Sequence, residues 1–366
     1  MVRRQSAAAG VSRRRQGRRY RHQYTLRAEF LYDNLAIAAN VIHAHACASE
    51  GDEKRMEDGR LVVLLTGANG FVGRNVAPVL KRAGMIVRQA ARTPSSDTTS
   101  IMIGTIGPHT DWAEALVGAD AVVHLAARVH HPREEHAADV YQSINTDGTL
   151  HLARCAAEAG VSHFVYLSTV LVNGSNTDGR PPFRENDLLT PRGVYGASKA
   201  AAEAGLETMV QYTNMNFTII RPPLIYGKGA LGNFRLLATA VNRGIPLPFG
   251  CVQNRRAFLS VANLASFIVH RLTNQHGRFD VFLVADEEQI STPEFVRRIG
   301  KVLGKKSRIV PFPLFVLNAL FRISGRSEAY NSVAASLEID MSKALKTGWR
   351  PPLSLDEGLR NALAPP

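Results

Sequence analysis

The sequence predicts an α/β fold in which a doubly wound parallel sheet is followed by a smaller C-terminal region. From residue 61 onward, short apolar runs of strand length alternate with helix-length segments. The first of them, LVVLLT (61–66), is a continuous apolar run, which is typical of a parallel strand buried on both faces. A composition of 45% hydrophobic and 20% charged residues over 366 positions is that of an ordinary globular protein.

Residues 1–58 differ from the rest in charge. Residues 1–55 hold 11 Lys and Arg against 5 Asp and Glu, so they carry +6 of the net charge of +13. We expect a basic, disordered extension here. Two alternatives stay open: a transit peptide, and a true start at Met56. The remaining +7 does not predict a nucleic-acid partner.

The strands and helices follow from apolar runs and their punctuation. We expect strands over residues 61–66, 85–91, 121–127, 163–169 and 217–223. We expect helices over residues 70–83, 140–159 and 195–212. Gly160 should end the second helix, and Pro222 with Pro223 should stop the last strand.

After Pro223 the pattern loosens, and glycine and proline become frequent. We expect residues 258–272 and 281–285 to return to the sheet. The run 310–321 is apolar but broken by two prolines, so we expect it to line the C-terminal region rather than to insert in a membrane. Three scattered cysteines suit a reducing cytoplasm and give no zinc pattern.

A glycine-rich turn follows the first strand and opens a helix. Residues 66–73 read TGANGFVG, with glycines at 67, 70 and 73. Glycines at this spacing let the backbone approach a pyrophosphate, and the helix N-terminus offers free N–H groups to it. The motif predicts a Rossmann-type domain that binds NAD or NADP. We expect that domain over residues 61–222 with 257–285, and a substrate-binding domain over 223–256 with 286–366.

The end of the second strand indicates which dinucleotide binds. An acidic residue there would bond the ribose hydroxyls of NAD. The sequence has none at this point, and Arg92, with Arg88 nearby, suits a 2′-phosphate. The sequence therefore favours NADP.

Tyr195 and Lys199 lie four residues apart at the start of a predicted helix, which places them on one face. A lysine cation lowers the pKa of a neighbouring tyrosine, so the tyrosine can act as acid and base. Ser168 and Thr169 end a strand whose carboxyl edge should face the same site, and a hydroxyl there can bond a substrate oxygen.

These motifs, in this order, resemble the nucleotide-sugar epimerase/dehydratase branch of the extended short-chain dehydrogenase/reductase family, of which UDP-galactose 4-epimerase is typical. The resemblance runs from about residue 61 to 363. The segments that carry it are TGANGFVG (66–73), HLAA (124–127), INTDGT (144–149), FVYLSTVLVNG (164–174), YGASK (195–199) and RPPLIYGKG (221–229).

The resemblance implies a role for each matching residue. Tyr195 would be the acid and base, Lys199 its modulator and ribose anchor, and Thr169, with Ser168 beside it, the catalytic hydroxyl. Asn233 would contact the nucleotide of the substrate, and Arg256 its diphosphate. The residues implied to hold the pyrophosphate are Gly67, Asn69, Gly70, Phe71, Val72 and Gly73. The residues implied to line the cofactor's ribose and nicotinamide are Leu125, Ala126 and Ala127.

The sequence departs from the family pattern where an Asp would bond adenine, since Thr105 stands there, and where a Tyr is usual, since Asn173 stands there. His130, His131 and His136 read as a solvated loop, and no metal site is expected.

We expect a cytoplasmic enzyme that acts by reversible hydride transfer at carbon 4 of a UDP-hexose, that is, an NAD(P)-dependent 4-epimerase and, as the resemblance implies, a homodimer. Two alternatives stay open: an NADPH-dependent UDP-4-keto-6-deoxyhexose 4-reductase, and a non-catalytic NAD(P)-binding scaffold.

Overall fold

A computed structural model of the protein describes residues 59–92, 100–129, 138–274, 277–323 and 327–364. They lie in one compact unit of the chain. The basic extension 1–58 and the histidines at 130, 131 and 136 lie outside the described residues.

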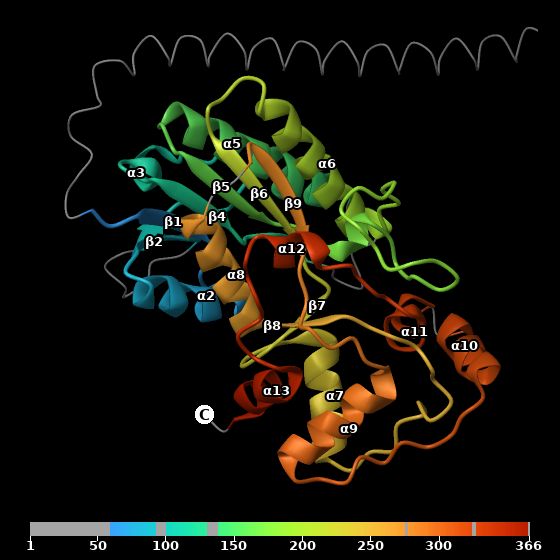
Figure 1. The fold of residues 1–366 in the computed structure, drawn as a ribbon. Coiled ribbons are helices and arrows are strands. Elements are labelled where there is room, and N and C mark those ends of the chain that lie inside the picture. The colour runs from blue at the N-terminus through green and yellow to red at the C-terminus, as the bar shows by residue number, and fades with distance from the viewer. Residues whose placement is uncertain (1–58, 93–99, 130–137, 275–276, 324–326, 365–366) are drawn as a thin grey trace, which may run out of the picture. The chain divides into compact units, whose positions relative to one another are not determined.

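Seven parallel strands form the central sheet, in the order β3-β2-β1-β4-β5-β6-β9 (Figure 1). The strands are β1 (Val62–Thr66), β2 (Ile86–Ala91), β3 (Ser100–Met102), β4 (Ala121–His124), β5 (His163–Leu167), β6 (Asn216–Arg221) and β9 (Phe279–Leu283). The predicted fold class is confirmed. The short edge strand β3 was not predicted, because only three residues pair with β2 there.

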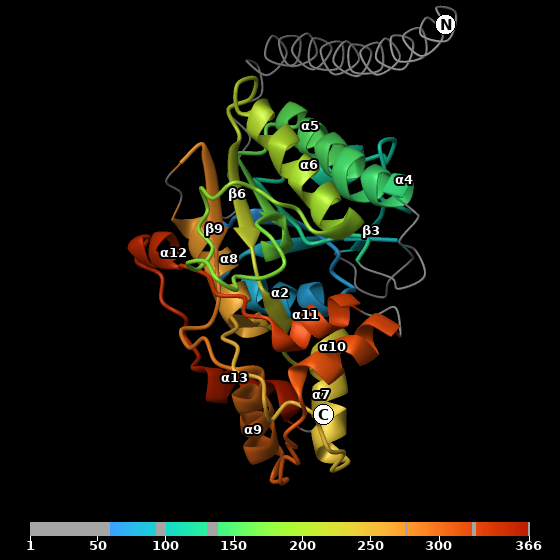
Figure 2. The same ribbon diagram turned by 90° about the vertical axis from the view of Figure 1, so that its right-hand side faces the viewer.

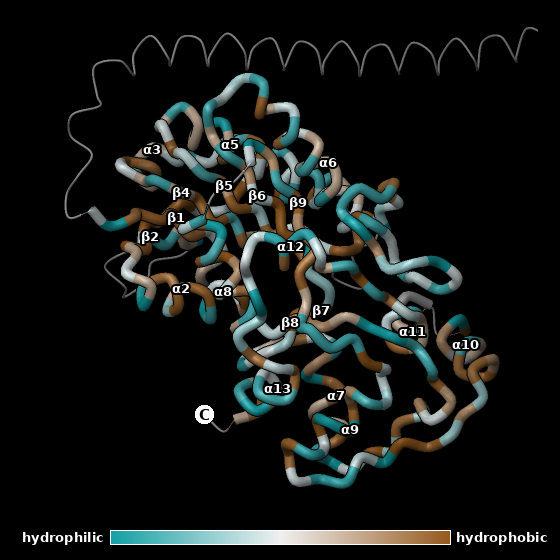
Figure 3. Tube along the Cα trace, viewed as in Figure 1, coloured by the Kyte–Doolittle hydropathy of each residue, from teal (hydrophilic) through white to brown (hydrophobic). Residues whose placement is uncertain are grey.

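Helices cover both faces of this sheet, as the two views show (Figures 1 and 2). On β1, Val63 and Leu65 belong to the core under α2 (Phe71–Arg82) and α8 (Val261–Thr273). Leu64 points to the opposite core, under α3 (Ala113–Leu116), α5 (Gly148–Glu158) and α6 (Gly193–Met209). β1 is therefore apolar on both faces over Val62–Leu65. Figure 3 shows apolar segments gathered in the sheet, with hydrophilic residues among them.

The order of the strands reverses between β1 and β4, which pair in register from Val63 and Ala121 to Thr66 and His124. In open parallel sheets, ligands bind beyond the carboxyl ends of strands at such a reversal. The glycine turn follows β1 at this point.

The helix predicted over 140–159 is interrupted. The structure has α4 (Ala138–Tyr141), a π-helical turn (Gln142–Asp147) and then α5. Within the wide turn, the Asn145 carbonyl accepts a hydrogen bond from Thr149 Oγ1 at 2.7 Å. Such turns within helices are frequent at functional sites.

A second lobe is built on the parallel pair β7 (Leu224–Tyr226) and β8 (Phe258–Ser260). Its helices are α7 (Gly232–Asn242), α9 (Thr292–Leu303), α10 (Leu314–Ile323), α11 (Ser327–Ala334) and α13 (Leu355–Leu363), while α12 (Ser342–Lys346) packs near β9.

The expectation that residues 258–272 return to the large sheet is wrong. Ser260 caps α8 by accepting a hydrogen bond from the Ala262 N–H at 3.3 Å, so this run divides into β8 and a helix. The second run does return to the sheet, as β9. In the segment 310–321, Leu317 is buried but Phe315 is 77% exposed, so it lines the lobe only in part. None of the described helices combines the length and apolar character needed to cross a membrane.

Candidate active site

The glycine turn has the backbone shape that a pyrophosphate requires. Gly67 has φ +71°, and a Cβ there would lie 2.7 Å from the Ala126 nitrogen. A Cβ on Gly73 would lie 2.2 Å from the Gly67 oxygen. Side chains at either position would close the turn, so these residues fit a bound dinucleotide.

The first turn of α2 leaves its N–H groups for a ligand. Gly70 is the N-cap, and no described side chain caps the helix. The first N–H groups of a helix have no intrahelical acceptor and attract anions. The Phe71 side chain packs against the core of the second lobe. If Phe71 contacts the pyrophosphate as expected, its backbone N–H would make the contact. Asn69 is exposed beside the turn.

The chain after β4 lies against this turn. Leu125, Ala126 and Ala127 are half-buried. The Leu125 N–H donates to the Thr66 carbonyl at 3.3 Å, and the Ala126 N–H donates to Thr66 Oγ1 at 3.3 Å. The structure therefore brings the predicted ribose and nicotinamide segment next to the predicted pyrophosphate segment.

Arg92 and Arg88 have different surroundings. Arg92 is exposed directly after β2. Arg88 Nη1 donates to the carbonyl oxygens of Ala115 at 2.8 Å and Val117 at 2.6 Å. Arg88 therefore anchors α3 instead of assisting Arg92.

Tyr195 and Lys199 lie on the first two turns of α6. Lys199 is 1% exposed, and its Nζ donates to the carbonyl of Leu167, the last residue of β5, at 2.7 Å. The same Nζ lies 4.4 Å from the centre of the Tyr166 ring. The start of α6 also holds the segment after Thr169, through the Arg192 N–H and the Leu171 carbonyl at 3.0 Å.

The pKa values of this pair differ from the sequence-based expectation. Burial raises the pKa of Tyr195 to about 12, and Tyr141 adds to the rise. Burial lowers the pKa of Lys199 to about 7, although Glu203 opposes the change. The expected lowering of the tyrosine pKa is therefore not seen in the protein alone, because burial and then Tyr141 raise that pKa.

The two predicted hydroxyls point to different partners. Ser168 is 3% exposed and donates its hydroxyl to Glu203 Oε1. Thr169 Oγ1 accepts a long hydrogen bond from the Leu171 N–H, at 3.3 Å, and donates none within the described part of the chain, so its proton is left for another partner. This geometry favours Thr169 over Ser168 as the residue that meets substrate.

Sequence reasoning did not single out Asn145, which connects the parts of the site. Its side chain pairs with the backbone of Arg128, accepting from the N–H at 2.7 Å and donating to the carbonyl at 3.0 Å. It also donates to Ser198 Oγ at 3.0 Å, which donates to the Tyr195 carbonyl at 2.9 Å. Asn145 stands in the polar run QSINTDGT (142–149), so no local pattern distinguished it from its neighbours.

A buried histidine supports the same region from β4. His124 shares hydrogen bonds with Thr66 Oγ1 at 2.7 Å and Thr149 Oγ1 at 2.9 Å. Its ring stacks on Tyr166 with 5.8 Å between centroids. Burial, and then the charge of Lys199, lower the pKa of His124 to about 3, so the ring is neutral.

The predicted substrate residues lie in the second lobe. Arg256 is 8% exposed, and its Nη1 donates to the carbonyls of Asn331 at 3.1 Å and Ala335 at 2.7 Å. Burial lowers its pKa to about 10, so it is a cation at neutral pH. Asn233 is exposed in the first turn of α7.

The two departures from the family pattern have different surroundings. Thr105 lines a cavity of about 650 Å³ between residues 103–111 and α4. Asn173 is fully buried, and its Oδ1 accepts from Arg221 Nη1 at 3.2 Å.

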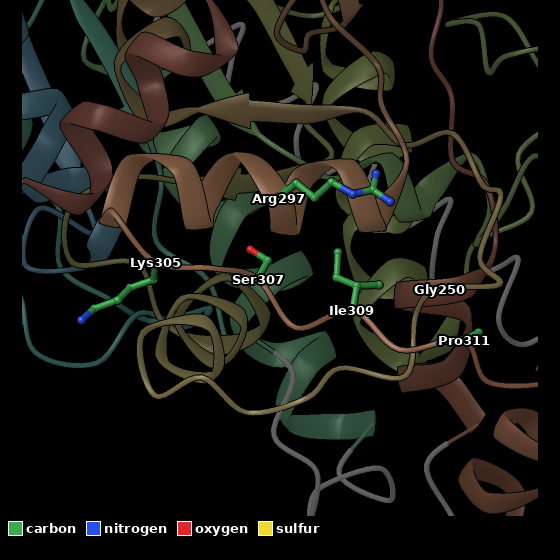
Figure 4. Close-up of a pocket in the computed structure, with 6 residues that line it drawn as sticks. All are labelled: Gly250, Arg297, Lys305, Ser307, Ile309 and Pro311. Atoms are coloured by element: carbon green, nitrogen blue, oxygen red, sulfur yellow. The ribbon is translucent and has the colours of Figure 1, made fainter.

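Another cavity, of about 420 Å³, lies between α9 and the strand-like segment 305–311 (Figure 4). Arg297 and Lys305 line it but point away from each other (Figure 4). Arg297 already pairs with Glu294 at 3.1 Å, and none of the predicted site residues lines this cavity. Within the described ranges, no three His, Cys, Asp or Glu side chains gather to hold a metal.

Comparisons with known proteins show which family the chain belongs to. The model of the NAD dependent epimerase/dehydratase family matches residues 63–285. A UDP-glucose 4-epimerase from Vibrio cholerae is 35% identical over 305 residues, which are 81% of this chain and 93% of that protein. An N-acetyl-alpha-D-glucosaminyl-diphospho-ditrans,octacis-undecaprenol 4-epimerase from Escherichia coli O157:H7 is 29% identical over 316 residues, 82% of this chain and 94% of that protein.

The fold has solved counterparts. The crystal structure of a UDP-glucose 4-epimerase from Thermus thermophilus in complex with NAD has a TM-score of 0.64 at 21% identity and covers 82% of this chain and 97% of that one. The segment that the family model matches, residues 63–285, includes the glycine turn, Thr169, Tyr195 and Lys199. The chain therefore belongs to the NAD-dependent epimerase/dehydratase family, whose enzymes work with a nicotinamide dinucleotide.

Proposed function

We propose that this protein is an NAD(P)-dependent 4-epimerase that inverts carbon 4 of a UDP-hexose. The observation that carries the proposal is the placement of Tyr195 and Lys199 on α6, beside the carboxyl ends of the strands that also carry the glycine turn and Thr169. The names of the two relatives, both 4-epimerases of diphosphate-linked sugars, support it.

The chain's own residues would share the proton chemistry. Bound NAD(P) supplies the acceptor and donor of the hydride at carbon 4. Tyr195 takes the proton of the 4-hydroxyl group and returns it to the oxygen of the 4-keto sugar when the other face of carbon 4 has been presented. The Tyr195 hydroxyl has no hydrogen-bond partner among the described residues, so it is free to meet that oxygen.

Thr169 and Lys199 support this transfer. Thr169 would donate its hydroxyl proton to the same sugar oxygen and so stabilise the charge that develops there. Lys199 would favour loss of the tyrosine proton while its amine is charged. Residues Gly67 to Gly73 would hold the pyrophosphate of the cofactor through backbone N–H groups, and Leu125 to Ala127 would line its ribose and nicotinamide.

The second lobe would hold the nucleotide part of the substrate. Two carbonyls fix one Nη of the Arg256 guanidinium, which leaves its other nitrogens for diphosphate oxygens. Asn233 would contact the nucleotide from the start of α7. We further propose that the enzyme works in the cytoplasm and that it forms a homodimer. Sedimentation of the purified chain would test the homodimer.

One specific observation favours a second candidate function, net reduction of a UDP-4-keto-6-deoxyhexose with NADPH. Arg92 is exposed at the end of β2, and Gln89, Ala90 and Ala91 before it provide no acidic side chain for ribose hydroxyls. The same position supports a preference for NADP over NAD.

One assay separates these functions. Purified protein with catalytic NAD or NADP is incubated with UDP-glucose or UDP-N-acetylglucosamine, and the sugar products and the absorbance at the NAD(P)H band are followed. Formation of the 4-epimer without a net change in absorbance supports the epimerase. Oxidation of NADPH by a 4-keto substrate alone would establish the reductase, and dinucleotide binding without either reaction would indicate a scaffold.

A further inference from the structure

A buried carboxylate lies one helical turn beyond Lys199. Glu203 follows Lys199 by four residues on α6, so the two side chains share a face of the helix. Glu203 is 4% exposed. Carboxylates are rarely buried unless they are paired, so this position needs an explanation.

Two neighbouring strands hold this carboxylate in place. From the end of β6, Arg221 donates through Nη2 to Oε2 at 2.5 Å and through Nε to both carboxylate oxygens, at 3.0 and 3.2 Å. From the end of β5, Ser168 donates its hydroxyl to Oε1. Arg221 is fixed in turn by Asn173 Oδ1 at 3.2 Å. These hydrogen bonds fix the position of the carboxylate.

The surroundings of Lys199 show why the charge of Glu203 matters. The groups that face Lys199 from the elements packed around it are Tyr166, the Leu167 carbonyl, His124 behind Tyr166, Tyr195 and Glu203. Burial keeps both tyrosines and the histidine neutral. Of these groups, Glu203 is the one that carries a negative charge. It raises the pKa of Lys199 against burial, although the Arg221 cation is paired with the same carboxylate.

We propose that Glu203 is a positioning residue whose carboxylate, fixed by Arg221 and Ser168, favours the charged form of the Lys199 amine beside Tyr195. Ser168 then serves this carboxylate, and Thr169 alone of the two hydroxyls is left for substrate. The inference deepens the proposed function and rests on it only for its kinetic consequence.

The test is a direct titration of Lys199 in the full chain, without cofactor or substrate. The protein is labelled with lysine that carries ¹³C at Cε, and the Lys199 signal is assigned with Lys199→Arg. The wild-type midpoint is expected near pH 7. Glu203→Gln keeps the shape and acceptor oxygen of the side chain but loses its charge, so the midpoint should fall by about one pH unit or more.

The sign of the shift distinguishes the proposal from a structural role. If Glu203 only holds the fold together, the variant loosens the site, water reaches Lys199 and its midpoint rises toward about 10.4. A rise, or no change, overturns the proposal. Glu207→Gln is the matched control, because Glu207 is exposed one turn further along α6, and its removal should leave the midpoint in place.

Arg221 is left buried and partly unpaired in Glu203→Gln, so a second variant protects the test against misfolding. Glu203→Gln/Arg221→Met removes both buried charges and is expected to fold. Because the Arg221 cation is lost together with the carboxylate, its Lys199 midpoint should fall less than in Glu203→Gln, and a midpoint at or above the wild-type value counts against the proposal.

The kinetic consequence is a shift of the pH profile of kcat/KM to lower pH in Glu203→Gln, with Glu207→Gln unchanged. If the wild type epimerises no UDP-hexose but Lys199 titrates as expected, the proposed function fails and the role of Glu203 stands. If epimerisation occurs and the midpoint does not fall, the proposed function stands and the role of Glu203 fails.

Discussion

Gly73→Ala should damage both the fold and the dinucleotide site. The added Cβ would lie 2.2 Å from the Gly67 oxygen and 2.6 Å from the Ala68 Cα, whereas ordinary contacts start at 3.4 Å. The neighbours are backbone atoms, so α2 and the turn must separate by about 1.2 Å. Overpacking of this kind costs about 1–3 kcal/mol. For a protein of this size that corresponds to a fall in Tm of roughly 1–5 °C.

The same displacement moves the N–H groups that would face the pyrophosphate. A misplacement of about 1 Å can cost roughly 100-fold in function, so we expect dinucleotide affinity to fall at least tenfold by calorimetric titration. Gly70→Ala is the matched control. Its Cβ meets only the Gly67 oxygen, at 3.1 Å, and φ is −75°, so Tm should change little while binding weakens. If Gly73→Ala keeps wild-type Tm and affinity, the assignment of this turn is refuted.

Three other substitutions test other parts of the molecule. Tyr195→Phe should abolish epimerisation while NAD(P) affinity, measured by fluorescence, stays within about threefold; retained turnover would remove Tyr195 from its role. Arg92→Ala should weaken NADP binding by at least about tenfold and NAD binding much less, and equal losses would show that Arg92 does not contact a 2′-phosphate. Burial lowers the pKa of His124 to about 3 and of His163 to about 4, so the unfolded chain binds more protons below pH 6.5 and stability is lost as pH falls. Each histidine should cost roughly 1.4 kcal/mol per pH unit in that range, and urea unfolding of His163→Gln should show a shallower pH dependence than the wild type.

The first βα unit could be predicted closely because its signals are local. Residues 61–73 combine a continuous apolar run with glycines at fixed spacing, and the structure has β1, the turn and α2 there. The spacing of Tyr195 and Lys199 likewise depends only on helical periodicity. Apolar periodicity cannot reveal the π-helical turn at 142–147, because the flanking residues continue the helical pattern.

Contacts between side chains that are distant in the sequence could not be predicted from local patterns. Arg88 and Arg92 look alike in the sequence, but Arg88 meets the carbonyls of α3, which approach only in the folded chain. Ser168 and Thr169 are adjacent hydroxyls, and what separates them is the pairing of Glu203 with Arg221. The effect of burial on the pKa of Tyr195 also depends on packing that no local pattern shows.

The first turn of α2 is shared between the two halves of the enzyme. Asn75 Nδ2 donates both to the Phe71 carbonyl at 2.8 Å and to the Lys228 carbonyl at 3.2 Å, and the Phe71 ring packs into the second lobe. A rigid hinge motion that opened the lobes would have to break this amide bridge and withdraw that ring. If a dinucleotide binds at the glycine turn and a sugar nucleotide enters between the lobes, this helix would couple the two events, and loosening one half should speed escape of the cofactor from the other.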